Sequence, residues 1–84
     1  MKLVFAEQAW ADYLYWQKQD KRTLERINKL IQEVMRHPTE GIGKPEPLKH
    51  ALAGWWSRRI NDEHRMVYKL EGNALWIAQL RYHY

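Results

Sequence analysis

The chain has 84 residues, of which 45% are hydrophobic and 29% are charged, a balance typical of a folded protein and not of a disordered one. A chain of this length is expected to form a single domain over residues 1–84. The absence of cysteine excludes disulfide bonds and thiolate metal sites, and no apolar run approaches the roughly 18 residues of a membrane helix. Because Glu7 interrupts the N-terminal apolar stretch early, we expect no signal peptide and a cytoplasmic protein.

The net charge is +4, and the basic excess lies toward the C-terminal half of the chain. Residues 1–41 contain seven Lys and Arg against six Asp and Glu, whereas residues 42–84 contain seven against four. Five Trp and five Tyr are spread through both halves. Cations that neutralise phosphates and rings that stack on bases favour single-stranded nucleic acid as a partner. Solvated surface cations without a special function give the same composition, so both interpretations stay open.

Two helices are predicted in the N-terminal half, after a short strand over residues 2–6. Residues 7–19 contain no Gly or Pro, and their three- and four-residue spacing predicts a helix that buries Trp10, Tyr13 and Leu14, with Trp16 as a fourth candidate. Asp20 is a good N-cap for a second helix that ends before Pro38. The expected apolar face of this second helix consists of Leu24, Ile27, Leu30, Ile31 and Val34. Two helices joined by so short a link form an antiparallel hairpin that must cover another surface.

The C-terminal half predicts a meander of three strands, namely "GWWSRRI", "RMVYKL" and "ALWIAQLRYHY". The polar turns "NDEH" and "EGN" separate these strands. The last strand is expected to stay paired to the end of the chain, with Arg81 and His83 on one face and Leu80, Tyr82 and Tyr84 on the other. These elements predict an α+β fold, in which the helical hairpin packs on an antiparallel β-sheet made of the short N-terminal strand and the meander.

The segment over residues 37–50 contains three prolines and two glycines, which predicts a loop. It places Glu46, Lys49 and His50 close together. The chain contains no phosphate-binding Gly loop and no nucleophile elbow. Because its four histidines lack the spacing of a zinc site, we expect neither a metal ion nor a cofactor.

The remaining acid–base and cationic groups favour RNA cleavage without a metal ion: Glu46, Lys49, Arg58, Arg59, Arg65, Arg81, His83 and Tyr84. In this reaction a base takes the proton of a ribose 2′-OH, cations stabilise the phosphate, and an acid protonates the departing 5′ oxygen. Arginine suits the phosphate because its planar fork donates two parallel hydrogen bonds.

Each of these groups also has an ordinary interpretation. Glu46 is equally typical of a solvated loop acid, His83 and Tyr84 of packing residues, and Arg58 and Arg59 of surface strand residues. The register of the hairpin decides which of these two arginines lies beside Arg65. His50 is a rival acid, and His64 is expected to face solvent in its turn.

Four motifs occur in order along the chain: "GKPEPLKH", "WSRRI", "EHRMVY" and the terminal "RYHY". Together with the helical segment "DYLYWQKQDKR", they give the chain a sequence that resembles the YoeB toxin family of the RelE/ParE superfamily over nearly its whole length. The resemblance implies a toxin of a type II toxin–antitoxin module that enters the ribosomal A site and cuts mRNA there as an endoribonuclease. It also implies a helical pair on an antiparallel sheet, a homodimer, and inhibition by a YefM-like antitoxin.

The resemblance assigns roles residue by residue. Glu46 matches the general base of the family, Arg65 the arginine that stabilises the phosphate, His83 the general acid, and Tyr84 the terminal tyrosine that helps to position the substrate. The basic residues that match or adjoin the substrate-binding part of the site are Lys49, Arg59 and Arg81. We expect the antitoxin to lay acidic and apolar side chains over the region of Arg59, Arg65 and Arg81.

Two other functions compete with this interpretation. One branch of the superfamily binds DNA gyrase and cuts no RNA, and it shares the fold. The other alternative is a non-catalytic basic RNA-binding module. The combination of Glu46, Arg65 and His83 favours RNA cleavage over both.

Overall fold

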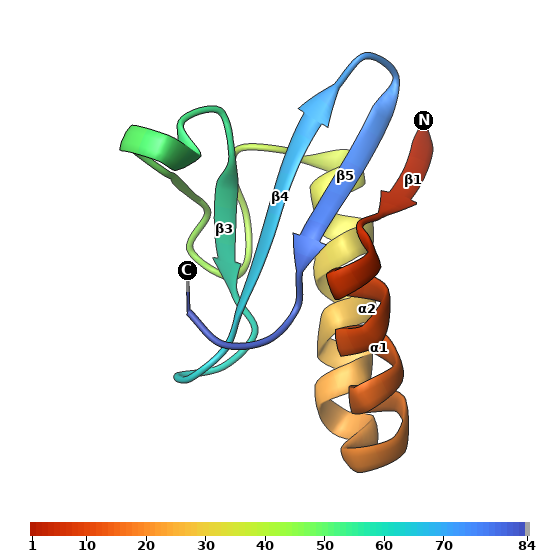
Figure 1. Ribbon diagram of the computed structural model, residues 1–84. Helices are drawn as coiled ribbons and strands as arrows, with labels where there is room; N and C mark the ends of the chain where they lie inside the picture. Colours follow the sequence, from red (N-terminus) through yellow and green to blue (C-terminus); the bar gives the residue numbers. More distant parts are fainter. Residues whose placement is uncertain (84) are drawn as a thin grey trace.

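A computed structural model describes residues 1–83 of the chain (Figure 1). The predicted α+β class is confirmed, since two helices accompany a five-stranded sheet. The elements in chain order are β1 (Lys2–Phe5), α1 (Glu7–Gln19), α2 (Lys21–Arg36), β2 (Glu46–Pro47), the 3-10 helix η1 (His50–Leu52), β3 (Trp56–Arg59), β4 (Arg65–Glu71) and β5 (Ala74–Gln79). Neither α1 nor α2 is long and apolar enough to cross a membrane, and the described residues offer no other α-helix.

The strands are arranged in the order β1-β5-β4-β3-β2. The meander of β3, β4 and β5 is antiparallel as predicted, whereas β1 pairs with β5 in parallel, so that the sheet is mixed. The loop over residues 37–50 also contributes a strand, β2, which pairs with the outer edge of β3. This edge strand has only two residues, because Pro45 and Pro47 lack the backbone N–H groups that a longer ladder needs.

The helix boundaries agree with the prediction. Asp20 caps α2, because its carboxylate accepts hydrogen bonds from the backbone N–H groups of Arg22 at 3.1 Å and Thr23 at 3.2 Å. Hydrogen bonds from the side chain and backbone of Thr23 lower the pKa of Asp20 from its ordinary value of 3.8. The apolar face of α2 is buried at Ile27, Leu30, Ile31 and Val34, while Leu24 is partly buried.

The predicted buried stripe of α1 is confirmed at Trp16 but wrong at Trp10 and Leu14. Trp10 is 50% exposed and Leu14 is 43% exposed, whereas the buried residues are Ala9, Asp12 and Trp16. Tyr13 is partly buried and packs against the core, and Trp10 stacks on it with ring centroids 5.8 Å apart. The apolar periodicity misled because Asp12, a carboxylate, occupies a buried position, where it accepts a hydrogen bond from the backbone of the C-terminal tail.

The described tail also departs from the prediction. β5 ends at Gln79, and residues 80–83 leave the sheet and run across toward β3 (Figure 1). Leu80 remains in the core, but its backbone N–H donates to Asp12 Oδ2 at 3.0 Å and its carbonyl accepts from Trp16 Nε1 at 2.8 Å. These backbone groups are therefore bonded to α1 and not to a neighbouring strand, which is why the expected alternation of faces fails. Tyr84 lies outside the described residues.

Candidate active site

The strand register places four polar side chains on one face of the sheet. Glu46 of β2 lies opposite Ser57 of β3, and Arg59 of β3 lies opposite Arg65 of β4. Directly opposed residues share a face, and so do residues two apart on one strand. Glu46, Ser57, Arg59 and Arg65 therefore project together, and Arg59 is the arginine beside Arg65. The intervening residue, Arg58, projects to the opposite face, where Met66 and Tyr68 pack against the helices.

A pocket of about 170 Å³ opens among these side chains, lined by Lys44, Glu46, Ser57, Arg59, Arg65 and His83. It joins four of the residues that the sequence singled out and adds two that it missed. Ser57 could have been found from its position two residues before Arg59 on a strand. Lys44 precedes β2 and has φ +49°, so the alternation of side chains along a strand could not have placed it. His83 comes from the tail, so the pocket combines three separate parts of the chain: a loop, the sheet and the tail.

The charges of this pocket suit an anionic group. Three cations, Lys44, Arg59 and Arg65, lie with one carboxylate, Glu46, and one imidazole, His83. Guanidinium groups match the geometry of a phosphate, while a carboxylate and an imidazole are the side chains that most often transfer protons. Among residues 1–83, His, Asp and Glu side chains form no group of three that could hold a metal ion.

Arg65 is held rigidly by the turn that precedes it. Its Nη1 donates to the carbonyl oxygens of Asn61 at 2.7 Å, His64 at 3.1 Å and Asp62 at 3.3 Å. The turn itself is shaped by Asn61 Oδ1, which accepts from the backbone N–H groups of Glu63 and His64. The three hydrogen bonds that Arg65 donates to this turn all come from Nη1, one nitrogen of a guanidinium group with five N–H donors. The "NDEH" segment therefore orients the guanidinium that lines the pocket.

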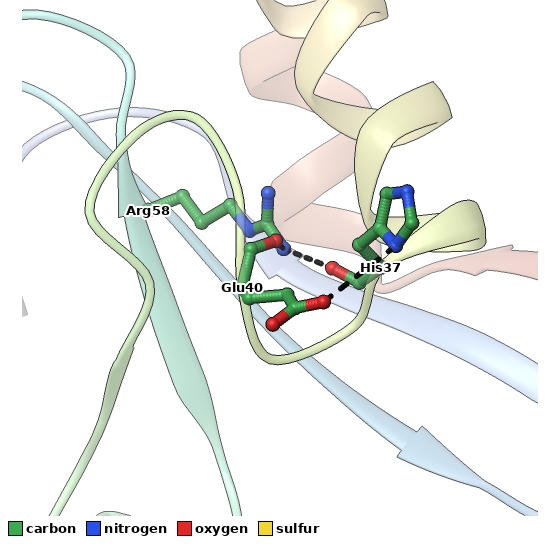
Figure 2. Close-up of polar contacts among 3 residues, drawn as sticks. All are labelled: His37, Glu40 and Arg58. Carbon is green, nitrogen blue, oxygen red and sulfur yellow. Dashed lines mark hydrogen bonds and ion pairs between the residues drawn. The ribbon is translucent and has the colours of Figure 1, made fainter.

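Arg58 organises the loop that leads into the pocket, and its interpretation as a surface residue is wrong. It is fully buried, and its guanidinium donates to the carbonyl oxygens of His37, Glu40 and Ile42, as Figure 2 shows for the first two. His37 is the C-cap of α2, where the helix dipole is negative and a cation is favourable. Loop carbonyls thus take the place of water around the buried charge.

Tyr68 completes this buried cluster. Its hydroxyl accepts from Arg58 Nε at 3.1 Å and donates to the Pro38 carbonyl at 2.8 Å. Burial raises the pKa of Tyr68 above its ordinary value of 10.0, and the neighbouring Arg58 cation opposes this shift. At the edge of the cluster, His37 Nδ1 lies 3.9 Å from Glu40 Oε1 (Figure 2).

After this cluster, the loop over residues 37–50 packs closely against the sheet. The Gly43 carbonyl accepts from the backbone N–H of Arg59 at 2.7 Å. Gly43 has φ +84°, and a Cβ atom there would lie 2.9 Å from Leu30 Cδ2 and 3.3 Å from the Arg59 carbonyl. No residue but glycine fits this position without movement of its neighbours. The loop thereby brings Lys44 and Glu46 to the rim of the pocket.

Lys49, His50 and Arg81 lie outside the pocket. Lys49 and His50 line a neighbouring hollow of about 330 Å³, whose wall also includes Glu46. The Arg81 guanidinium carbon lies 3.5 Å from the ring centroid of Tyr15 on α1 and 4.6 Å from that of Tyr82. Arg81 therefore stacks between α1 and the tail and does not line the pocket.

Known proteins resemble the chain over its full length. A family model described as the YoeB-like toxin of bacterial type II toxin–antitoxin systems matches residues 5–84. Toxin YoeB of Escherichia coli (strain K12) is 58% identical over 84 residues, which are 100% of both chains. A solved structure of the YoeB/ParE toxin from Agrobacterium tumefaciens has 51% sequence identity, a TM-score of 0.98 and coverage of 100% of both chains.

YoeB from Staphylococcus aureus resembles the chain in two solved assemblies. The structure of its dimer has a TM-score of 0.93 at 47% identity and covers 100% of this chain and 98% of that one. Its heterotetrameric YoeB-YefM toxin–antitoxin complex has a TM-score of 0.92, with the same identity and coverage. With a family model that matches all but four residues and relatives that are more than half identical, the chain belongs to the YoeB-like toxins of bacterial type II toxin–antitoxin systems.

Proposed function

We propose that this toxin is an endoribonuclease that cleaves mRNA in the ribosomal A site and thereby inhibits translation. The observation that carries the proposal is the single pocket in which Glu46, Arg59, Arg65 and His83 meet. A carboxylate and an imidazole supply a base and an acid, and the two arginines supply the charge that a phosphate needs. This set accounts for the reaction without a metal ion.

The proposed reaction proceeds by attack of the ribose 2′ oxygen on the adjacent phosphorus. Glu46 accepts the 2′-OH proton while the new O–P bond forms, and Arg65, with Arg59, stabilises the charge on the phosphate oxygens. His83 donates a proton to the 5′ oxygen as its bond to phosphorus breaks. The products are a 2′,3′-cyclic phosphate and a 5′-hydroxyl. Proton transfers of this kind contribute about 10²- to 10⁴-fold each.

Three residues have supporting roles in this proposal. Lys49 lies in the hollow that shares Glu46 with the pocket, so it is placed to contact RNA that continues past the cleaved bond. Arg81 stacks between Tyr15 and Tyr82, and from there it is proposed to bind substrate beside the tail. Tyr84, as the family's terminal tyrosine, is proposed to position the substrate. The reaction would take place in the cytoplasm, where mRNA meets ribosomes.

The partners follow from the same relatives. The S. aureus YoeB structures are a dimer and a complex with YefM, and we propose a homodimer and a YefM-like antitoxin for this chain. A net charge of +4 favours an acidic partner segment, because opposite charges speed association. We expect this segment to cover the pocket arginines, and antitoxin binding that is insensitive to salt would contradict this.

Primer extension on mRNA from a purified translation reaction tests the activity. The wild type should produce breaks at A-site codons, whereas Glu46→Gln and His83→Gln should produce none. Glu71→Gln is the matched control, because Glu71 is an exposed carboxylate at the far end of β4 and should leave the breaks unchanged. The same RNA without ribosomes tests the dependence on the ribosome.

The alternative functions give different results in this assay. A gyrase-binding toxin would leave the mRNA intact and inhibit supercoiling of DNA. A non-catalytic RNA-binding module would bind RNA in a salt-sensitive way and give no cut product. The pocket favours cleavage over both, since neither alternative needs a carboxylate beside the arginines.

A further inference from the structure

His64 holds the backbone of the tail one residue before His83. The Tyr82 backbone N–H donates to His64 Nδ1 at 2.7 Å, and the Tyr82 carbonyl accepts from the backbone N–H of Arg65 at 3.0 Å. Both backbone groups of Tyr82 are therefore bonded to the segment that ends the "NDEH" turn. His64 is partly buried there, which corrects the expectation that it faces solvent.

Tyr82 has an unusual backbone conformation that needs this support. Its φ is +63°, in the left-handed region that residues with a Cβ atom rarely adopt. Such a conformation persists only where the surroundings enforce it. The bonds to His64 and Arg65 enforce it here, and the resulting bend turns the chain so that His83 enters the pocket.

The His64 ring is itself fixed by α1. Trp16 lies against it edge to face, with ring centroids 4.9 Å apart and an interplanar angle of 77°. The Trp16 indole N–H donates to the Leu80 carbonyl at 2.8 Å, so the same side chain holds both His64 and the start of the tail. The Tyr82 ring also lies beside the imidazole, with centroids 5.9 Å apart.

We infer that His64 is a positioning residue for the proposed RNA cleavage: its imidazole accepts the Tyr82 N–H at Nδ1 and so keeps His83 in the pocket. The inference rests on the proposed function for its effect on cleavage, but the contact itself is independent of that function. It assigns His64, which does not line the pocket, the role of hydrogen-bond acceptor for the tail.

The hydrogen bond also defines which nitrogen of the His64 ring carries the proton. To accept the Tyr82 N–H at Nδ1, the imidazole must carry its proton on Nε2. The role of His64 is therefore to supply one acceptor nitrogen at a fixed place beside the tail.

Two substitutions test the hydrogen-bond acceptor and the aromatic ring of His64 one at a time. His64→Asn keeps an oxygen near the position of Nδ1, whereas His64→Phe keeps the ring against Trp16 and has no acceptor. On programmed ribosomes, His64→Phe should lower kcat by about 10²-fold with little change in KM, because a small misplacement of a reacting group has this effect. His64→Asn should retain most of the wild-type kcat. Equal losses in the two variants, or no loss in His64→Phe, would overturn the inference.

A second measurement does not depend on catalysis. In a His83→Gln background, the Tyr82 amide should be protected from hydrogen exchange with His64 or with Asn at position 64, and unprotected with Phe. If the wild type cuts no RNA, the proposed function fails while these amide data still decide the role of His64. Equal protection of the Tyr82 amide in all three proteins would refute the role of His64.

Discussion

Arg59 lies directly opposite Arg65 in the antiparallel pair of β3 and β4, so two guanidinium groups share one face of the sheet. Directly opposed like charges destabilise a sheet by roughly 0.2–1 kcal/mol. A phosphate bound between them turns this repulsion into attraction, because each guanidinium donates hydrogen bonds to an oxyanion. The pair is thus unfavourable for folding and favourable for binding an anion.

The first prediction separates these two effects. Arg59→Gln should raise the free energy of unfolding by up to about 1 kcal/mol, because the repulsion is removed. The same change should slow mRNA cleavage by about 10²-fold, the loss typical of one donor to a developing charge. Urea denaturation and single-turnover cleavage measure the two quantities. Lys29→Gln, which removes an exposed charge on α2, should change neither, and a joint fall in stability and activity for Arg59→Gln would contradict the prediction.

The second prediction concerns the neighbouring Arg58, which is fully buried. Arg58→Met should lower the free energy of unfolding by about 3 kcal/mol or more, because the carbonyls of His37, Glu40 and Ile42 lose their donor. Arg58→Lys should also destabilise, since one ammonium group cannot reach acceptors spread along the loop. Urea denaturation measures both variants beside Arg59→Gln, and equal stabilities of the substitutions at 58 and 59 would show that the loop does not depend on Arg58.

The third prediction concerns pH and Tyr68. Burial raises the pKa of Tyr68, so the folded state favours the neutral phenol. The resulting stability is present below the ordinary pKa of 10.0 and is lost as the pH rises through the higher pKa of the folded state. Tyr68→Phe should cost about 1–3 kcal/mol near neutral pH, because Pro38 loses its donor and Arg58 an acceptor.

Stability measured against pH separates the hydrogen bonds of the Tyr68 hydroxyl from the effect of its ionisation at alkaline pH. The difference between the wild type and Tyr68→Phe should shrink above pH 10.0, since the variant has no phenol to ionise. A constant difference over the alkaline range would mean that the hydroxyl does not ionise before the protein unfolds.

Local patterns in the sequence were enough to predict most of the fold. The face of α2 and the cap at Asp20 depend on residues within a few positions of one another, and both agree with the structure. The failures involve distant polar contacts. Asp12 is buried because it binds the backbone of a residue 68 positions away, and Arg58 because it binds carbonyls 16 to 21 positions away. Apolar periodicity carries no information on such contacts.

The same reason limited the prediction of the site. The resemblance named Glu46, Arg59, Arg65 and His83, which the structure brings to one pocket, while Lys44 and Ser57 were missed. Alternation along β2 and β3 would have placed Ser57 on the right face, but only the register shows which strands meet. The contact of His64 with Tyr82 joins a side chain to a backbone group, and no property of either residue predicts it.

The last prediction uses these tail contacts. Deletion of residues 83 and 84 should abolish mRNA cleavage and leave the fold intact, because the bonds of Leu80 to α1 and of Tyr82 to His64 and Arg65 all precede the deleted residues. Circular dichroism should show a melting temperature close to that of the wild type, and primer extension should show no breaks. Full-length His83→Gln is the matched control, since it should lose cleavage with its tail complete. A truncated protein that still cuts mRNA would exclude His83 as the acid, whereas one that unfolds would mean that the end of the tail stabilises the sheet.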